Sequence, residues 1–130
     1  MKYTLIFFIL FYFNNNLNAQ KNSNSLIIGK SIKIERLEIA QYDFPNTMSW
    51  SDAKKGCNDL GEGWRLPTKD ELYILYLNKK ELGNFTDNNY WSISNNNGSG
   101  AWSQNFSTSF QNLILVSYSY NARCIKPFIF

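Results

Sequence analysis

Two cysteines and the complete absence of histidine limit the chemistry that this sequence can carry. Cys57 and Cys124 are the two cysteines of the chain. Without histidine, the commonest general base of enzymes and a common zinc ligand are missing, and two cysteines complete a tetrahedral zinc shell only with help from carboxylates. We predict no metal and no cofactor. In an exported chain we expect an intramolecular disulfide, with two buried thiols or an intermolecular bridge as alternatives.

Asp70 and Glu71 are the carboxylate pair that we considered for acid–base hydrolysis. They follow Thr68 at the start of a predicted helix. A threonine N-cap with glutamate three residues later is a capping box, and acidic side chains are favoured at helix N-termini. We therefore predict a structural role for both acids and no enzyme activity, with a cryptic hydrolase as a minor alternative.

The N-terminus has the pattern of a secretory signal peptide. Lys2 precedes the apolar run from Leu5 to Phe13, and small and polar residues lead up to Gln20. The run is about half of the roughly twenty residues that a membrane-spanning helix needs. We predict export to the periplasm, the cell surface or the medium, with no membrane span after cleavage. The predicted division is a signal peptide over residues 1–19, a flexible leader over 20–28 and one domain over 29–130.

The spacing of the apolar residues predicts the type of each element. Apolar and polar residues alternate over residues 29–44, which predicts a β-hairpin that turns at Glu35–Arg36. In the next two segments apolar residues recur every three or four positions, and Ser49 and Thr68 are predicted N-caps. The two helices are expected over residues 50–60 and 69–79.

The composition changes after Leu82, because Asp87 is the one charged residue between Gly83 and Ala122. Asparagine, serine and aromatic residues dominate this segment, and we predict an antiparallel meander with strands near residues 90–93, 101–106, 113–116 and 122–125. A hairpin, two helices and a meander make an α+β layout. The apolar C-terminus, residues 125–130, is expected to complete the sheet or contact a partner. The 13 basic and 10 acidic residues nearly balance, which argues against a nucleic-acid partner.

Several motifs together resemble the family of the Lcl adhesin C-terminal domain, a family of unknown function related to the fibrobacter major paralogous domain. The resemblance spans roughly residues 29–128. It is carried by Trp50–Lys54 with Cys57, Gly63–Thr68 (GWRLPT) with Glu71 and Leu72, Tyr90–Ser92, Ala101–Trp102 and Arg123–Lys126.

This resemblance implies a C-type-lectin-like fold, in which two short helices pack on antiparallel sheets. A cysteine on the first helix is joined to one on the last strand in that fold, which implies a Cys57–Cys124 bond. The resemblance also implies that Arg65 forms structural hydrogen bonds. It assigns a mainly buried position to Trp64, Leu66, Trp91 and Trp102, and a structural role to Trp50, Pro67, Thr68 and Glu71.

The sequence departs from the better-known members of this fold. Sugar-binding lectins use Glu-Pro-Asn and Trp-Asn-Asp motifs around a calcium ion that needs six to eight oxygen ligands, and neither motif is present here. Sulfatase-activating enzymes need a redox-active or copper-binding cysteine pair, whereas both cysteines here are assigned to structure. We therefore predict calcium-independent, non-catalytic binding.

The leading interpretation is a binding domain, because the uncharged segment 88–121 has the Trp, Tyr, Asn and Ser content of antibody paratopes. The expected ligand is a carbohydrate or an extracellular protein. The alternative is a structural or accessory domain without a ligand, whose loop residues are ordinary polar residues. The candidate contacts are Asn95, Asn96, Asn97, Ser99, Asn105, Gln111 and Tyr120.

Overall fold

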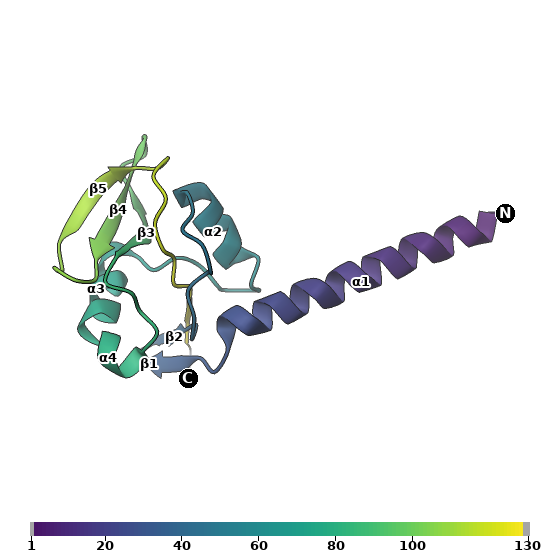
Figure 1. Ribbon diagram of the computed structural model, residues 1–130, viewed down its shortest axis with the longest axis horizontal. Helices are drawn as coiled ribbons and strands as arrows, with labels where there is room; N and C mark the ends of the chain where they lie inside the picture. The colour runs from purple at the N-terminus through teal and green to yellow at the C-terminus, as the bar shows by residue number, and fades with distance from the viewer. Residues whose placement is uncertain (1, 129–130) are drawn as a thin grey trace.

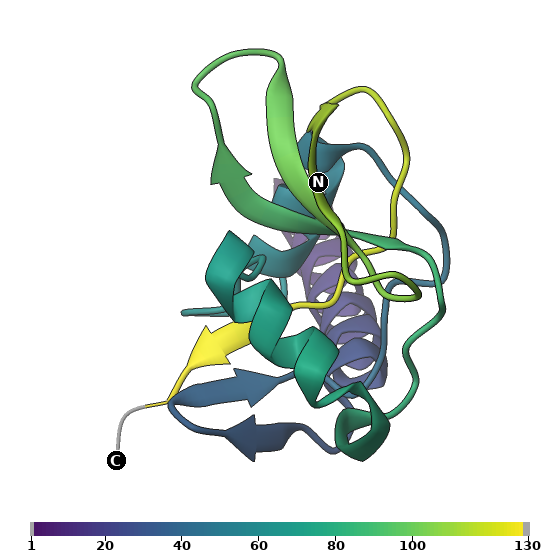
Figure 2. The same cartoon turned by 90° about the vertical axis from the view of Figure 1, so that its left-hand side faces the viewer.

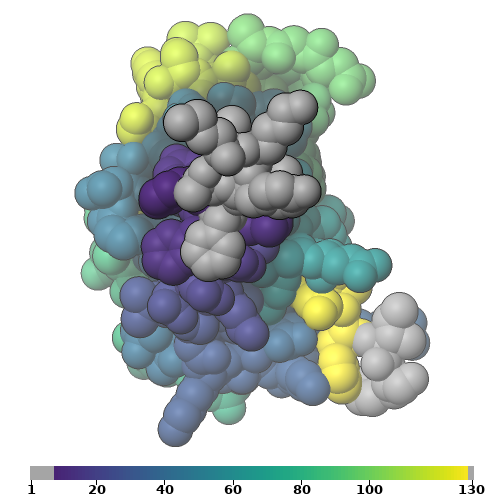
Figure 3. Space-filling model, turned by 90° about the vertical axis from the view of Figure 1, so that its right-hand side faces the viewer, coloured from purple at the N-terminus to yellow at the C-terminus, as the bar shows by residue number. Residues whose placement is uncertain are grey.

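The computed structural model describes residues 2–128. Met1 of the predicted signal peptide, and Ile129 and Phe130 of the apolar C-terminus of the predicted domain, lie outside the described residues. Helix α1 (Lys2–Ile28) projects away from the remainder of the chain, which folds into one body (Figure 1). Figure 3 views the molecule from the N-terminal end of this helix. Within residues 2–128, no helix combines the length and the apolar character that crossing a membrane requires.

The body contains two three-stranded antiparallel sheets. The predicted hairpin is present, and Glu35 at its turn has a φ of +53°, a conformation that non-glycine residues seldom adopt. The strand orders are β1 (Ile32–Ile34), β2 (Leu37–Ile39), β6 (Ile125–Pro127) in the first sheet and β3 (Asn89–Asn95), β4 (Gly100–Asn105), β5 (Gln111–Leu115) in the second.

The predicted four-stranded meander is wrong in its last strand. β6 is not part of the second sheet. It pairs with β2 in the first sheet, where Ile125 is the cross-strand partner of Ile39. Residues 122–124 are not a strand, because their carbonyl groups bind loop residues: the Ala40 N–H donates to the Cys124 carbonyl at 3.0 Å. An alternating pattern identifies a strand, but the choice of its neighbour depends on which apolar surface it covers.

The helices begin where their caps predict. α2 (Trp50–Asn58) starts after Ser49, whose hydroxyl accepts the Asp52 N–H, and α3 (Lys69–Leu77) starts with a complete capping box at Thr68. The second helix is interrupted near its predicted end, because the Asn78 amide donates to the Ile74 carbonyl at 2.9 Å and closes the last turn. A separate turn, α4 (Lys79–Leu82), follows.

Residues 20–28 form the last turns of α1, which corrects the expectation of a flexible leader. The Asn24 amide donates to the Asp59 carbonyl at the end of α2, with an N–O distance of 2.9 Å. Ile27 and Ile28 pack against the core, and their carbonyls accept backbone N–H groups from the loop after β2. The C-terminal end of α1 is therefore packed against the body, although its composition is polar.

The Cys57–Cys124 disulfide is present and confirms the expected pairing. It joins α2 to the segment before β6 across 67 residues, with the two Cα atoms 5.4 Å apart. The bond lies in one of two buried clusters, where α2 packs against Trp64, Leu66 and Trp91. The second cluster brings α3 against both sheets (Figure 2). It contains Leu37, Ile39, Leu72, Leu75, Leu82, Tyr90, Phe106 and Ile125.

Arg123 is a fully buried cation that contacts three segments of the body. Its Nε donates to Asp43 Oδ1 at 2.7 Å, its Nη1 to the Ala40 carbonyl at 3.2 Å and its Nη2 to the Asn84 carbonyl at 2.8 Å. The guanidinium also lies 3.9 Å from the centroid of the Phe85 ring. One side chain thus holds together the loop after β2, the loop after α4 and the chain that enters β6.

Tyr90 completes this network by donating its hydroxyl to Asp43 Oδ2 at 2.5 Å. Burial raises the pKa of the Asp43 carboxyl above its ordinary value, against the lowering influence of Arg123 and of the Tyr90 hydrogen bond. Burial and the hydrogen bond to Asp43 raise the pKa of Tyr90 to about 12. Tyr90 therefore remains a hydrogen-bond donor throughout the neutral pH range.

Replacement of Arg123 by methionine should lower the free energy of unfolding by about 3–5 kcal/mol, because Asp43 is then left buried without its cation. Urea denaturation followed by tryptophan fluorescence measures this loss. The matched control is Arg36→Met at an exposed arginine, which we expect to change stability by less than about 0.5 kcal/mol. An Arg123→Met variant within about 1 kcal/mol of the wild type would show that the network is dispensable.

Candidate binding surface

The amides at the tip of the β3–β4 hairpin shape their own turn. Asn95 Oδ1 accepts the Asn97 N–H at 2.8 Å, and Asn96 Oδ1 accepts the N–H groups of Gly98 at 3.1 Å and Gly100 at 3.3 Å. Asn97 has a φ of +59°, in the left-handed region that asparagine tolerates better than most residues. The side-chain oxygens of two of the candidates at this tip, Asn95 and Asn96, therefore already accept backbone N–H groups.

Asn105 and Gln111 lie at the opposite end of the same sheet from the tip, because β4 runs the full length between them. Asn105 Oδ1 accepts the N–H groups of Ser107 and Thr108, at 2.8 and 2.9 Å. Gln111 Nε2 donates to Gln104 Oε1 and to the Lys69 carbonyl, both at 2.9 Å. These two candidates fix a turn and the junction with α3.

Tyr120 stands apart from both ends of the sheet. Its ring packs on the Trp91 ring with centroids 4.8 Å apart, and its backbone pairs with Met48. It borders a shallow depression of about 320 Å³. The seven candidates, including the exposed Ser99 beside the hairpin tip, are therefore spread over three places and do not form one site. The depression is lined by Thr47, Asn88, Asn89, Ser119, Tyr120 and Asn121.

Arg65 has the structural hydrogen bonds that the resemblance implies. Its two terminal nitrogens bind the Glu71 carboxylate at 2.7 and 2.9 Å, and Nη1 also donates to the Leu66 carbonyl at 3.1 Å. Glu71 accepts the Thr68 N–H at 2.9 Å as well. Burial by itself would raise the pKa of Glu71, but the hydrogen bonds from Arg65 and Thr68 hold the pKa below its ordinary value. The carboxylate is ionised and fully engaged, which does not suit a general acid.

The other motif residues connect α2 and the loop before α3 to the second sheet. The indole N–H of Trp50 donates to the Ser92 carbonyl, and that of Trp91 donates to the Met48 carbonyl, both at 2.8 Å. Trp64 and Leu66 are buried. The buried Pro67 accepts the Ile93 N–H with its carbonyl at 2.7 Å.

Trp102 is partly buried and does not belong to either buried cluster. The Lys69 ammonium lies 3.6 Å from the centroid of its ring, an attractive cation–π contact. Leu113 is the cross-strand partner of Trp102 on β5 and is 43% exposed. Leu115 is 52% exposed and points to the same side, because alternate residues of a strand share a face. We call Trp102, Leu113 and Leu115 the β5 apolar face.

Sequence reasoning missed this surface. The apolar run around Ile114 predicts a strand, and Ile114 does pack toward the core. The signal that was available is the exclusively apolar and amide content of both faces of β5, since a strand with one solvated face usually alternates apolar and charged residues. Phe110 and Tyr118, which lie beyond the two ends of β5 in the sequence, are 69% and 51% exposed.

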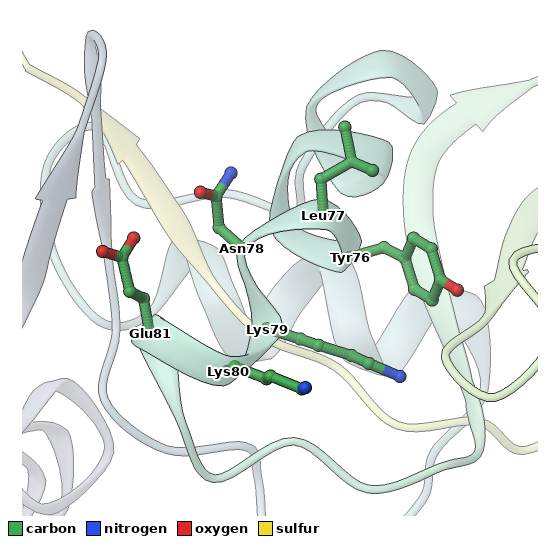
Figure 4. A pocket seen from close by; sticks show the side chains of 6 residues that line it. All are labelled: Tyr76, Leu77, Asn78, Lys79, Lys80 and Glu81. Atoms are coloured by element: carbon green, nitrogen blue, oxygen red, sulfur yellow. The ribbon is translucent and has the colours of Figure 1, made fainter.

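A second depression, of about 330 Å³, lies at the junction of α3 and α4 and is lined by the consecutive residues 76–81. Figure 4 shows the side chains of Tyr76 and Lys79 side by side, with Glu81 pointing away from them. Lys79 donates to the Phe106 carbonyl at 2.5 Å, so this lysine is a structural donor. Within residues 2–128, no three His, Cys, Asp or Glu side chains gather closely enough to hold a metal ion.

Comparison with solved structures identifies the fold. The chain is similar to a crystal structure of botrocetin, with a TM-score of 0.59 and 13% identity over 76% of this chain and 97% of that chain. It is also similar to a chain in the complex of a mutant von Willebrand factor A1 domain with botrocetin, with a TM-score of 0.54, 13% identity and the same coverage. The chain therefore has the C-type-lectin-like fold, as predicted. No protein-family model matches the sequence, and no curated protein matches it significantly.

The Arg65–Glu71 pair makes stability depend on pH. Glu71→Gln should lower the free energy of unfolding by about 1–3 kcal/mol near pH 7, because a charged, bidentate hydrogen-bonded pair is lost. The folded-state pKa of Glu71 is depressed, so this stabilisation is present above the ordinary carboxyl pKa of 4.5 and disappears as the pH falls below it.

Denaturation at a series of pH values measures this dependence, and the wild-type and Glu71→Gln curves should converge in acid. The exposed neighbour supplies the control, since Asp70→Asn should change stability by less than about 0.5 kcal/mol at every pH. A difference between wild type and Glu71→Gln that stays constant into strong acid would contradict the assigned ion pair.

Proposed function

We propose that this chain is an exported, non-catalytic binding domain that recognises an extracellular protein through the β5 apolar face. The exposure of Leu113 and Leu115 beside the partly buried Trp102, on one side of the sheet, carries this proposal. The cores of protein interfaces are rich in aromatic residues and poor in charge. The segment 88–121 has this composition, with no Asp, Glu, Lys or Arg residue. Exposed apolar side chains that gather on one face mark interaction sites.

Export is supported by the signal-peptide pattern and by the disulfide, which suits an oxidising compartment. The C-type-lectin-like fold is compatible with the resemblance to the Lcl adhesin C-terminal domain, so we propose membership of that family and a role in adhesion. We also propose that binding is independent of calcium, because the sequence lacks the calcium-binding motifs of the sugar-binding lectins.

A protein fits the surface better than a carbohydrate does. Sugar hydroxyls need side chains with free donors and acceptors, whereas the oxygens of Asn95, Asn96 and Asn105 already accept backbone N–H groups. Leucine side chains offer contact area but no hydrogen bond to a hydroxyl. Botrocetin, which shares the fold, occurs in a complex with a protein domain. A carbohydrate remains the second candidate, for which the hairpin tip 95–99 would be the contact.

The experiment is a binding screen with the disulfide-bonded protein isolated after export, on arrays of purified extracellular proteins and of glycans, with and without a calcium chelator. The double variant Leu113→Ser/Leu115→Ser removes apolar area from the face at exposed positions, so the fold is retained. It should weaken binding to the protein partner by roughly tenfold or more, in line with the loss of central interface side chains. The wild type should bind equally well in chelator.

The matched control changes Asn95, Asn96 and Asn97 to alanine and should leave protein binding intact. Glycan binding that is lost in this triple variant would replace the protein proposal by the carbohydrate candidate. Binding that the chelator abolishes would overturn calcium independence. Absence of binding on both arrays would favour a structural or accessory domain.

A further inference from the structure

The outer edge of β5 presents unpaired backbone groups. The Val116 N–H donates to the Ser99 carbonyl at 2.8 Å, and the Asn105 N–H donates to the Phe110 carbonyl at 2.9 Å. These two bonds flank the paired region of β4 and β5, and the register is continuous between them. In antiparallel strands bonded and non-bonded pairs alternate, so Asn112 and Ile114 bond to β4. Residues 111, 113 and 115 therefore point their N–H and C=O groups away from it.

The opposite edge of the same sheet is closed, which makes the β5 edge distinctive. On β3 the Trp91 N–H donates to the Asn121 carbonyl at 3.0 Å, and the Ile93 N–H donates to the Pro67 carbonyl at 2.7 Å. On β5, within residues 2–128, the Leu115 carbonyl accepts the Tyr118 N–H at 3.1 Å, and the remaining outward groups of residues 111–115 have no backbone partner. Figure 1 shows β5 at the free margin of the sheet.

β5 also lacks the devices that normally keep an edge strand from pairing. Native edges are protected by charged side chains, proline, bulges or a covering segment. The strand Gln-Asn-Leu-Ile-Leu has no charge and no proline, and its pairing with β4 has no bulge. An exposed edge with these properties is a template for another strand.

We propose that a second copy of this chain adds to the β5 edge, so that two three-stranded sheets become one six-stranded sheet. The backbone groups that point away from β4 belong to residues 111, 113 and 115. If two β5 strands pair in antiparallel over their whole length, the two-fold axis passes through Leu113. Leu113 of each copy then faces Leu113 of the other, and Gln111 faces Leu115. Phe110, which is 69% exposed, lies opposite Val116 of the second copy. A two-fold contact of this kind is self-complementary and closed.

The charge distribution favours a second copy as the occupant. The chain has a net charge of +3, yet residues 88–121 carry none of it, so two β5 edges approach each other without like-charge repulsion. Strand pairing uses backbone groups in the plane of the sheet, and the side chains of the β5 apolar face stand perpendicular to that plane. The dimer thus leaves this face accessible and doubles its area. The inference is independent of the proposed function.

Residue-resolved hydrogen exchange at increasing protein concentration tests the proposal on protein isolated after export. The amides of residues 111, 113 and 115 should become protected as dimer forms, over roughly 10 µM to 1 mM as expected for a small interface. The amides of Asn112 and Ile114 bond to β4 and should be protected at every concentration. Analytical ultracentrifugation should show the monomer–dimer equilibrium over the same range. A monomer throughout, or a dimer with unchanged exchange at residues 111, 113 and 115, would overturn the proposal.

Two substitutions of Leu113 distinguish the contribution of its backbone N–H to the dimer from that of its side chain. Leu113→Pro removes an outward N–H, a change that edge strands tolerate, and should weaken the dimer by roughly tenfold or more. Leu113→Ala removes most of the same side chain but keeps the N–H, and should leave dimer formation closer to the wild type. Equal weakening in both variants would contradict strand pairing, and the exchange pattern of the wild type decides the question if Leu113→Pro does not fold. Loss of dimer without loss of partner binding would leave the proposed function standing.

Discussion

The buried Arg123–Asp43 pair is the interaction on which the rest of the structure depends. A guanidinium without solvent contact is costly unless every donor is satisfied, and here a carboxylate and several backbone carbonyls satisfy it. Those carbonyls belong to the loop after β2 and the loop after α4, and the Ala40 N–H also joins the first of these loops to the Cys124 carbonyl before β6. The cation therefore holds the loop after β2, the loop after α4 and the start of β6 together. In this way it also constrains how the second sheet packs on the first.

Local features of this fold were predictable because local physics determines them. The caps at Ser49 and Thr68 and the approximate positions of β3, β4 and β5 follow from neighbouring residues. Strand partners do not follow in this way. β6 was assigned to the wrong sheet because its pattern is equally suited to either, and the choice was made by the cluster around Ile39 and Leu75. The docked end of α1 was missed for a similar reason, since its contacts are with α2.

The candidate site shows a second limit of reasoning from residue types. Asparagine-rich loops predict polar recognition, but asparagine is also the residue that builds tight turns, and the oxygens of Asn95, Asn96 and Asn105 serve the turns. Apolar residues on a strand predict a core, but β5 directs Ile114 inward and leaves Leu113 and Leu115 outside. Which face of a strand is buried depends on how the layers pack together, and the local sequence does not determine that packing.

The pairing of β6 with β2 has a consequence for how the chain is made. The first sheet, the disulfide and the buried guanidinium all require residues 123–127, the last described stretch of the body. These contacts are separated by more than half of the sequence, and such long-range contacts form late. During synthesis from the N-terminus, these contacts cannot form until residues 123–127 have been made. Until then, neither the disulfide nor the buried ion pair can form.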